Sequence, residues 1–165
     1  FNFNSYLRRD IQGEVADYVI IMGYDEHFAG SEEAGSVASI GYVRNGIEKT
    51  LEEVPAEKVI NAVPFYTRLW ETDASGKVSS SALGMSAAER TVTSNGAIQE
   101  WSEEAGQYYA QYEKGDSFYQ IWLEEERSIE EKAKLIKEYD LAGIASWRLG
   151  YEKDEIWDIL LKYVN

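Results

Sequence analysis

Three apolar segments of the sequence are each followed by side chains that could bind and orient a substrate. A phenol, a carboxylate and a guanidinium supply directed hydrogen bonds, and an indole supplies a flat apolar surface. The candidates are Tyr24 and Asp25 after the first segment, Tyr66 and Arg68 after the second, and Trp147 in the third. Together they predict a ligand-binding cleft, provided that the three segments lie side by side.

The segments that must position these groups alternate between strand and helix patterns. Short β-branched apolar runs predict strands, and apolar residues three to four positions apart predict helices. In chain order we expect a helix over Asn4–Ile11, a strand over Ala16–Met22, a helix over Ile40–Val54, a strand over Val59–Phe65, a helix over Ser128–Tyr139, a strand over Ala142–Gly150 and a helix over Asp154–Tyr163. This alternation is typical of parallel βα units, whose ligand groups lie at the C-terminal ends of the strands.

Between Trp70 and Glu126 the pattern changes to that of an antiparallel insert. We expect a loop over Gly76–Met85, a helix over Ser86–Ser94 opened by a capping box of Ser86 and Glu89, and two strands joined at Lys114–Asp116. Six aromatic residues of this insert could line a sugar-binding wall or fill the insert's own core. They are Tyr108, Tyr109, Tyr112, Phe118, Tyr119 and Trp122.

Charge and composition exclude several classes of partner. The 165 residues carry a formal charge of −14, which disfavours binding to nucleic-acid phosphates and to anionic membranes. The chain contains no cysteine, so it has no disulfide or thiolate metal site, and no apolar run approaches the ~20 residues of a membrane span. Because the sequence begins with Phe1 and not with methionine, we expect a fragment whose targeting signals lie upstream.

The remaining titratable groups are assigned structural roles. His27 is the only histidine and lacks the ligand spacing of a metal site, so we expect neither metal binding nor catalysis from it. The acidic run Glu124–Glu126 is interpreted as charge favoured near a helix start, with no apolar pocket that would raise a carboxyl pKa. Ser128 and Glu131 are predicted to form the capping box of that helix.

Three motifs resemble those of glycoside hydrolase family 18, the chitinase-like family. "MGYD" at 22–25 is similar to the family's sixth-strand motif, "PFYTRLW" at 64–70 to its seventh-strand signature, and "SWRLG" at 146–150 to its eighth-strand segment. The resemblance implies an α/β fold, namely strands six to eight of a TIM (β/α)8 barrel with a chitinase-insertion-like α+β subdomain. The implied divisions are 1–69 and 127–165 for the barrel and 70–126 for the insertion.

The resemblance also implies a reaction and a role for each residue. The family hydrolyses β-linked N-acetylglucosamine glycans such as chitin or peptidoglycan, retaining the anomeric configuration, with the substrate's acetamide as nucleophile and without metal or cofactor. Tyr24 would orient that acetamide, and Asp25 would hold a sugar hydroxyl. Trp147 would form the floor under the sugar, Met22 would pack beside it, and Tyr66 and Arg68 would contact the adjoining subsite.

Each of these residues also has a purely structural interpretation. Tyr24 and Asp25 could be a strand-end tyrosine and a loop cap, and Met22 and Trp147 could be core residues. Arg68 could pair with a surface carboxylate.

Two family motifs are missing from the sequence, and one of them is the third-strand Ser-x-Gly-Gly segment. No segment carries the acidic pattern Asp-x-x-Asp-x-Asp-x-Glu, whose Glu protonates the leaving group. We therefore expect that Glu upstream, in an N-terminal barrel part that is this chain's partner, and an inactive chain in isolation. Exposed sheet edges predict a homo-oligomer for the isolated chain, and the resemblance implies an extracellular or cell-envelope location. A non-catalytic chitinase-like lectin and an envelope structural domain without a sugar ligand remain alternatives.

Overall fold

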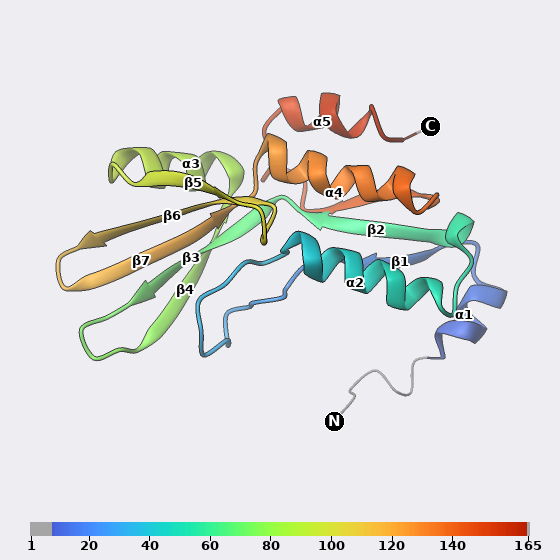
Figure 1. Cartoon of the computed structure of the whole chain (residues 1–165), viewed down its shortest axis with the longest axis horizontal. Helices are drawn as coiled ribbons and strands as arrows, with labels where there is room; N and C mark the ends of the chain where they lie inside the picture. Colours follow the sequence, from blue (N-terminus) through green and yellow to red (C-terminus); the bar gives the residue numbers. More distant parts are fainter. Residues whose placement is uncertain (1–7, 165) are drawn as a thin grey trace.

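The computed structural model describes residues 8–164 and places their strands in two sheets (Figure 1). The first sheet is parallel and has the order β1-β2-β8. Its strands are β1 (Val19–Met22), β2 (Val59–Pro64) and β8 (Gly143–Trp147). The predicted α/β class and the predicted parallel pairing of these three segments are thus confirmed, and all three strands end at the same edge.

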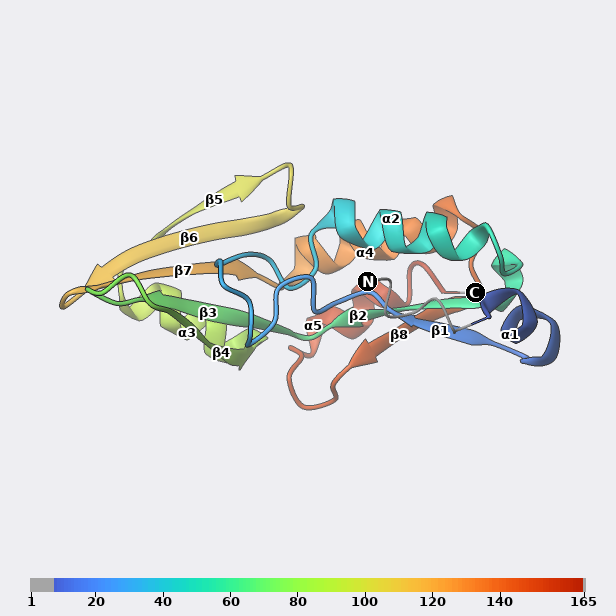
Figure 2. The ribbon, with the colours of Figure 1, turned by 90° about the horizontal axis from the view of Figure 1, so that it is seen from below.

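Helices cover one face of the parallel sheet. Seen from below, α2 (Ile40–Leu51) and α4 (Glu126–Glu138) lie on the same side of the strands (Figure 2). Val43 and Ile47 from α2 pack with Leu135 and Ile136 from α4 against Val59 of β2. The closing helix α5 (Glu155–Leu160) adds Ile156 and Leu160 to a second buried cluster with Ile129 and Ala133 of α4. This burial of apolar stripes is what holds the strands in register.

The opposite face of the parallel sheet is open in the part of the chain that the structure describes. Met22 is 70% exposed and Ile20 is 58% exposed, although both are apolar and both lie on a strand. Strands β1 and β8 each have one neighbour, so both edges of the sheet are unpaired within residues 8–164. An apolar face and two free edges are surfaces that parallel sheets ordinarily bury.

The second sheet is antiparallel, with five strands in the order β4-β3-β7-β6-β5. Only Phe65 separates β2 from β3, so the backbone passes almost directly from one sheet to the other. Helix α3 (Met85–Ser94) covers one face, where Ala88 and Val92 meet Ala110 and Ile121. The strands are β3 (Tyr66–Thr72), β4 (Val78–Gly84), β5 (Ile98–Ser102), β6 (Gln107–Lys114) and β7 (Ser117–Leu123).

Several predicted elements were wrong or shifted. The predicted loop over Gly76–Met85 contains β4, which pairs with β3 over seven residues, and β5 was not predicted. The first helix, predicted over Asn4–Ile11, is α1 (Arg9–Val15) in the described part, and residues 4–7 lie outside it. A 3-10 turn, η1 (Ala56–Lys58), precedes β2. The division at residue 69 stays a prediction, and β3 runs across it.

Both predicted capping boxes were wrong in their residues. Helix α4 begins at Glu126, and its capping box joins Glu125 to Ser128, which lies in the first turn and not at the cap. Gly84 precedes α3 and makes no side-chain cap, because a glycine has no side chain to offer. Among residues 8–164, no helix has the length and apolar composition that a membrane crossing requires.

Candidate active site

Tyr24, Asp25 and Tyr66 meet at the C-terminal edge of the parallel sheet. The Tyr66 hydroxyl donates a hydrogen bond to Asp25 Oδ1. The rings of Tyr24 and Tyr66 pack edge to face, with centroids 6.2 Å apart and planes at 73°. Two of the three predicted segments therefore contribute to one cluster of polar groups.

Two backbone features place Asp25 in this position. Gly23 continues the pairing of β1 by donating its N–H to the Ala62 carbonyl at 2.9 Å. A Cβ atom at Gly23 would lie 2.5 Å from Asn61 Oδ1 and 2.9 Å from the Ala62 carbonyl, so only glycine fits. Asp25 has φ 63°, in the left-handed region that aspartate tolerates better than most residues. The chain thus turns sharply at the strand end and presents the carboxylate to Tyr66.

Burial raises the pKa of both phenols of the cluster above the ordinary value for tyrosine. Desolvation raises the pKa of Tyr66, and the hydrogen bond to Asp25 raises it further. Desolvation, followed by the charge of Asp25, also raises the pKa of Tyr24. The Tyr66 hydroxyl gives its one hydrogen to Asp25, so within residues 8–164 the Tyr24 hydroxyl is the phenolic donor of this cluster that a ligand could use.

Met22 and Trp147 lie on the open face of the sheet. Met22 stands opposite Ala62, and Trp147 stands opposite Pro64 in the next strand. The Trp147 carbonyl accepts a hydrogen bond from the Phe65 N–H at 2.7 Å, so the backbone of Trp147 is adjacent to the strand end that carries Tyr66. The Trp147 side chain is 55% exposed. The third predicted segment thus reaches the same edge, with its indole available to a ligand.

Arg68 is turned toward the neighbouring strand β4. Its Nε donates to Ser80 Oγ at 2.8 Å, and its terminal nitrogen lies 3.4 Å from the Ser80 carbonyl. Within the described residues it forms no salt bridge with a carboxylate. Because side chains alternate along a strand, Arg68 and Tyr66 lie on the same face of β3.

The loop between β1 and α2, residues 25–39, is held by the antiparallel sheet. Trp70 of β3 donates its indole N–H to the Gly35 carbonyl at 2.8 Å. His27 packs edge to face on Trp70, and its Nδ1 lies 2.8 Å from the Ser36 carbonyl. No group of three potential metal-ligating side chains forms within residues 8–164. His27 therefore has a structural environment inside the loop.

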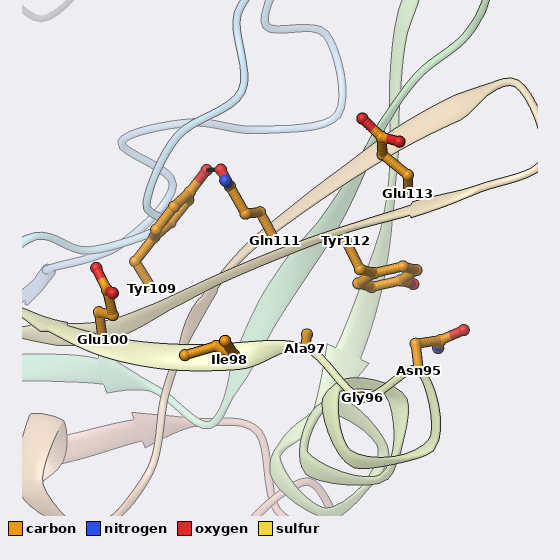
Figure 3. A pocket seen from close by; sticks show the side chains of 9 residues that line it. All are labelled: Asn95, Gly96, Ala97, Ile98, Glu100, Tyr109, Gln111, Tyr112 and Glu113. Carbon is orange, nitrogen blue, oxygen red and sulfur yellow. Dashed lines mark hydrogen bonds between the residues drawn. The ribbon is translucent and has the colours of Figure 1, made fainter.

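The aromatic residues of the insert divide between its two faces. Tyr108 packs against the buried cluster under α3, whereas Tyr109 contacts Trp122 with ring centroids 4.9 Å apart. Tyr112 and Tyr119 are stacked at 4.9 Å and 9°. A hollow of about 460 Å³ lies at β5 and β6, and its lining includes Tyr109 and Tyr112, which project from opposite faces of β6 (Figure 3). The residues predicted from the strand-end motifs do not line this hollow; they are Met22, Tyr24, Asp25, Tyr66, Arg68 and Trp147.

The interpretation of the acidic run Glu124–Glu126 was incomplete. Glu125 caps α4, as a residue near a helix start would, but Glu124 is only 1% exposed and pairs with the fully buried Lys132. Burial raises the pKa of the Glu124 carboxyl, against the opposing charge of Lys132. Glu124 therefore belongs to a buried ion pair, and the expectation that no buried environment raises a carboxyl pKa in this run was wrong.

Comparison with known proteins gives a consistent set of matches. The family model described as "Glycosyl hydrolases family 18" matches residues 2–152. A cortical fragment-lytic enzyme of Bacillus subtilis is 30% identical over 155 residues, which are 93% of this chain and 36% of that protein. The chain spans between 33% and 43% of the length of three curated relatives from Bacillus subtilis.

Two solved structures resemble the chain closely in fold. A chitinase from Chromobacterium violaceum has a TM-score of 0.84 and 27% identity, and the match covers 93% of this chain and 47% of that one. The spore cortex-lytic enzyme SleL of Bacillus megaterium has a TM-score of 0.83 and 26% identity, covering 95% of this chain and 36% of that one.

Proposed function

The chain belongs to glycosyl hydrolase family 18, and from this membership we propose that it forms the C-terminal part of the catalytic domain of a glycoside hydrolase. In this proposal β1, β2 and β8 are strands six, seven and eight of a TIM (β/α)8 barrel. The insertion, over residues 70–126, contains α3 and the second sheet apart from residues 66–69 of β3.

The arrangement of the parallel sheet supports this placement. Its three strands are parallel, have helices on one face only, and leave both outer edges and the other face open among residues 8–164. In a closed barrel each strand has two neighbours and the inner face is packed by the remaining strands. The preceding barrel strands would pair with β1 and β8 and cover Met22 and Ile20. This upstream part of the protein is the partner that we propose, and without it the isolated chain would associate with itself through the same surfaces.

The proposed reaction is hydrolysis of a β-linked N-acetylglucosamine glycan with retention of configuration. The acetamide oxygen of the substrate attacks the anomeric carbon while a Glu from the upstream part gives its proton to the leaving oxygen. Water then opens the oxazolinium ion and restores the acetamide. Because the attacking atom is part of the substrate, the protein gains rate mainly by holding it in the attacking geometry.

In this reaction the residues of the chain bind and orient the substrate. Tyr24 donates its phenolic hydrogen bond to the acetamide, and Asp25 accepts one from a sugar hydroxyl. Trp147 stacks under the sugar ring, with Met22 beside it, and Tyr66 and Arg68 contact the next sugar. The observation that carries the proposal is the hydrogen bond from Tyr66 to Asp25, because it joins two strand ends in one polar cluster at the edge where such folds bind ligands.

Three curated relatives are named as cortical fragment-lytic enzymes, which supports peptidoglycan over chitin as the substrate. Spore cortex-lytic and cortical fragment-lytic enzymes stand among the proteins that this chain resembles. We propose cell-wall peptidoglycan as the glycan and the cell envelope as the location.

The test uses the longer protein that contains this chain. It is incubated with peptidoglycan fragments and, separately, with chitooligosaccharides, and the anomeric configuration of the first product is read by NMR. Release of β-anomeric N-acetylglucosamine ends supports the proposal. Binding without cleavage would favour the lectin alternative, and neither binding nor cleavage would favour the structural domain.

A further inference from the structure

A buried polar network joins α4, the antiparallel sheet and the loop 25–39. Its centre is the pair of Glu124, the first residue after β7, and Lys132 of α4, with Lys132 Nζ 3.0 Å from Glu124 Oε1. Ser128 Oγ donates to Glu124 Oε2 at 2.8 Å. Both members of the ion pair are inaccessible to solvent, at 1% and 0% exposure. Separating them would strand a charge in the core.

Gln107 of β6 extends this network toward the loop. Its Nε2 donates to Glu124 Oε1 at 2.8 Å, and its Oε1 accepts a hydrogen bond from Ser36 Oγ. Gln107 is fully buried, and Ser36 is nearly so. Because the Gln107 amide nitrogen is fixed by a carboxylate, its oxygen must face Ser36, so the orientation of the amide is determined.

Ser36 in turn holds the residues that follow Asp25. Its carbonyl accepts the His27 N–H at 3.2 Å, and the Val37 carbonyl accepts the Glu26 N–H at 2.9 Å. The Glu26 carboxylate accepts hydrogen bonds from the Ser39 N–H at 2.8 Å and the Ser39 hydroxyl at 3.0 Å. The two arms of the loop are thus tied together immediately after Asp25, whose backbone has the left-handed φ of 63°.

The presence of a buried ion pair does not by itself indicate added stability of the fold. Replacing a buried ion pair by apolar side chains of similar volume is often neutral or stabilising, so the pair is better explained by the geometry that it fixes. That geometry connects three separate parts of the chain. Figure 1 shows that β6 begins and β7 ends close to the start of α4, and the hydrogen bond from Ser36 to Gln107 attaches the loop at the same place.

We propose that Gln107 is a positioning residue, which anchors the loop 25–39 to the Glu124–Lys132 pair and so holds Asp25 in the conformation that meets Tyr66 and the substrate. Gln107 touches no substrate and acts through Ser36. The link to substrate rests on the proposed function. The link to the loop does not.

The experiment compares Ser36→Ala and Gln107→Leu in the longer protein that contains this chain. Each variant removes the hydrogen bond between the two side chains from a different end. Gln111→Leu is the matched control, because Gln111 lies on the same face of β6 but is exposed, and its side chain accepts a hydrogen bond from the Tyr109 hydroxyl and belongs to no buried network. Circular dichroism confirms that each variant is folded at the assay temperature.

Two readouts are measured on each variant. We expect hydrogen exchange at the Glu26 and His27 amides to accelerate about tenfold in both network variants, and kcat to fall about 10- to 100-fold with little change in KM. A purely structural role would lower the melting temperature without changing kcat. Should Gln107→Leu fail to fold, Ser36→Ala alone decides.

Unchanged amide exchange would overturn the proposal, as would faster exchange with the kcat of the control. A wild type without turnover would refute the proposed function and the catalytic part of this inference. In that case amide exchange alone decides whether Gln107 positions the loop.

Discussion

The hydroxyl of Tyr66 is hydrogen-bonded to the carboxylate of Asp25, across a sequence separation of 41 residues. Tyr66 is the first residue of β3, and Asp25 lies three residues beyond the end of β1. The bond therefore links the end of the parallel sheet to the start of the antiparallel sheet. Together with burial, this bond favours the protonated form of the Tyr66 phenol, because both raise its pKa.

This chemical state predicts how stability depends on alkaline pH. The pKa of Tyr66 is raised in the folded protein by burial and by Asp25, whereas in the unfolded chain it is about 10. Above pH 10 the unfolded chain releases this proton and the folded chain keeps it, so the stabilisation present below pH 10 is lost as pH rises, by at most about 1.4 kcal/mol per pH unit. Tyr66→Phe should lose less stability than the wild type between pH 9 and pH 11 in urea titrations. Parallel curves for the two proteins would contradict the assignment.

Tyr24→Phe tests the proposed contact with the acetamide. The Tyr24 ring packs against Tyr66 and the core under α2, and phenylalanine preserves that packing. We expect kcat to fall about 100-fold, as for the loss of one directed donor in an active site, while the free energy of unfolding changes by less than about 0.5 kcal/mol. Turnover of a chromogenic N-acetylglucosaminide by the longer protein measures the effect. Wild-type turnover in the variant would remove Tyr24 from the mechanism.

Substitutions of Asp25 separate its carboxylate from its backbone conformation. Asp25→Asn keeps a residue that tolerates positive φ but lacks the anionic acceptor for Tyr66, and Asp25→Ala lacks the acceptor and adds strain. Both variants should lose activity in the longer protein. Asp25→Ala should be less stable than Asp25→Asn by about 1 kcal/mol in chemical denaturation. Equal stability of the two would show that the left-handed turn carries no strain.

Gly23→Ala tests the close approach of β1 to β2. The new methyl group would lie 2.5 Å from Asn61 Oδ1 and 2.9 Å from the Ala62 carbonyl, so we expect a loss of about 1–3 kcal/mol in the free energy of unfolding. Gly41→Ala in α2 is the control, because its methyl group meets nothing within 4 Å and alanine favours a helix by up to about 1 kcal/mol. The prediction fails if both substitutions stabilise the protein.

The parallel sheet was predictable because its strands are short apolar runs separated by amphipathic helices. The antiparallel sheet was harder to predict from the sequence, and β4 illustrates the reason. The serines of β4 are typical of a loop. As an edge strand, however, β4 has one side in solvent, and backbone pairing with β3 is enough to form it. The family resemblance identified the motif residues at the strand ends, whereas their roles rest on the proposed reaction.

One feature of the sequence could have predicted a buried charge in α4, although the amino-acid composition could not. Lys132 lies on the apolar stripe of α4, three residues after Ile129 and four before Ile136. A lysine in such a stripe requires a carboxylate partner if it is buried. Glu124 supplies it from outside the helix, so periodicity within α4 could not identify the pair.

A double-mutant cycle on this pair tests whether its two charges depend on each other. Lys132→Met leaves the Glu124 carboxylate buried with hydrogen bonds from Ser128 and Gln107 but without a cation, and should cost about 3–5 kcal/mol in the free energy of unfolding. Combining it with Glu124→Gln removes the stranded charge and keeps an oxygen that accepts the Gln107 N–H. The double variant should therefore recover most of the loss. Urea denaturation of the wild type, the two single variants and the double variant gives the coupling energy, and strictly additive losses would mean that Lys132 and Glu124 are buried as independent groups.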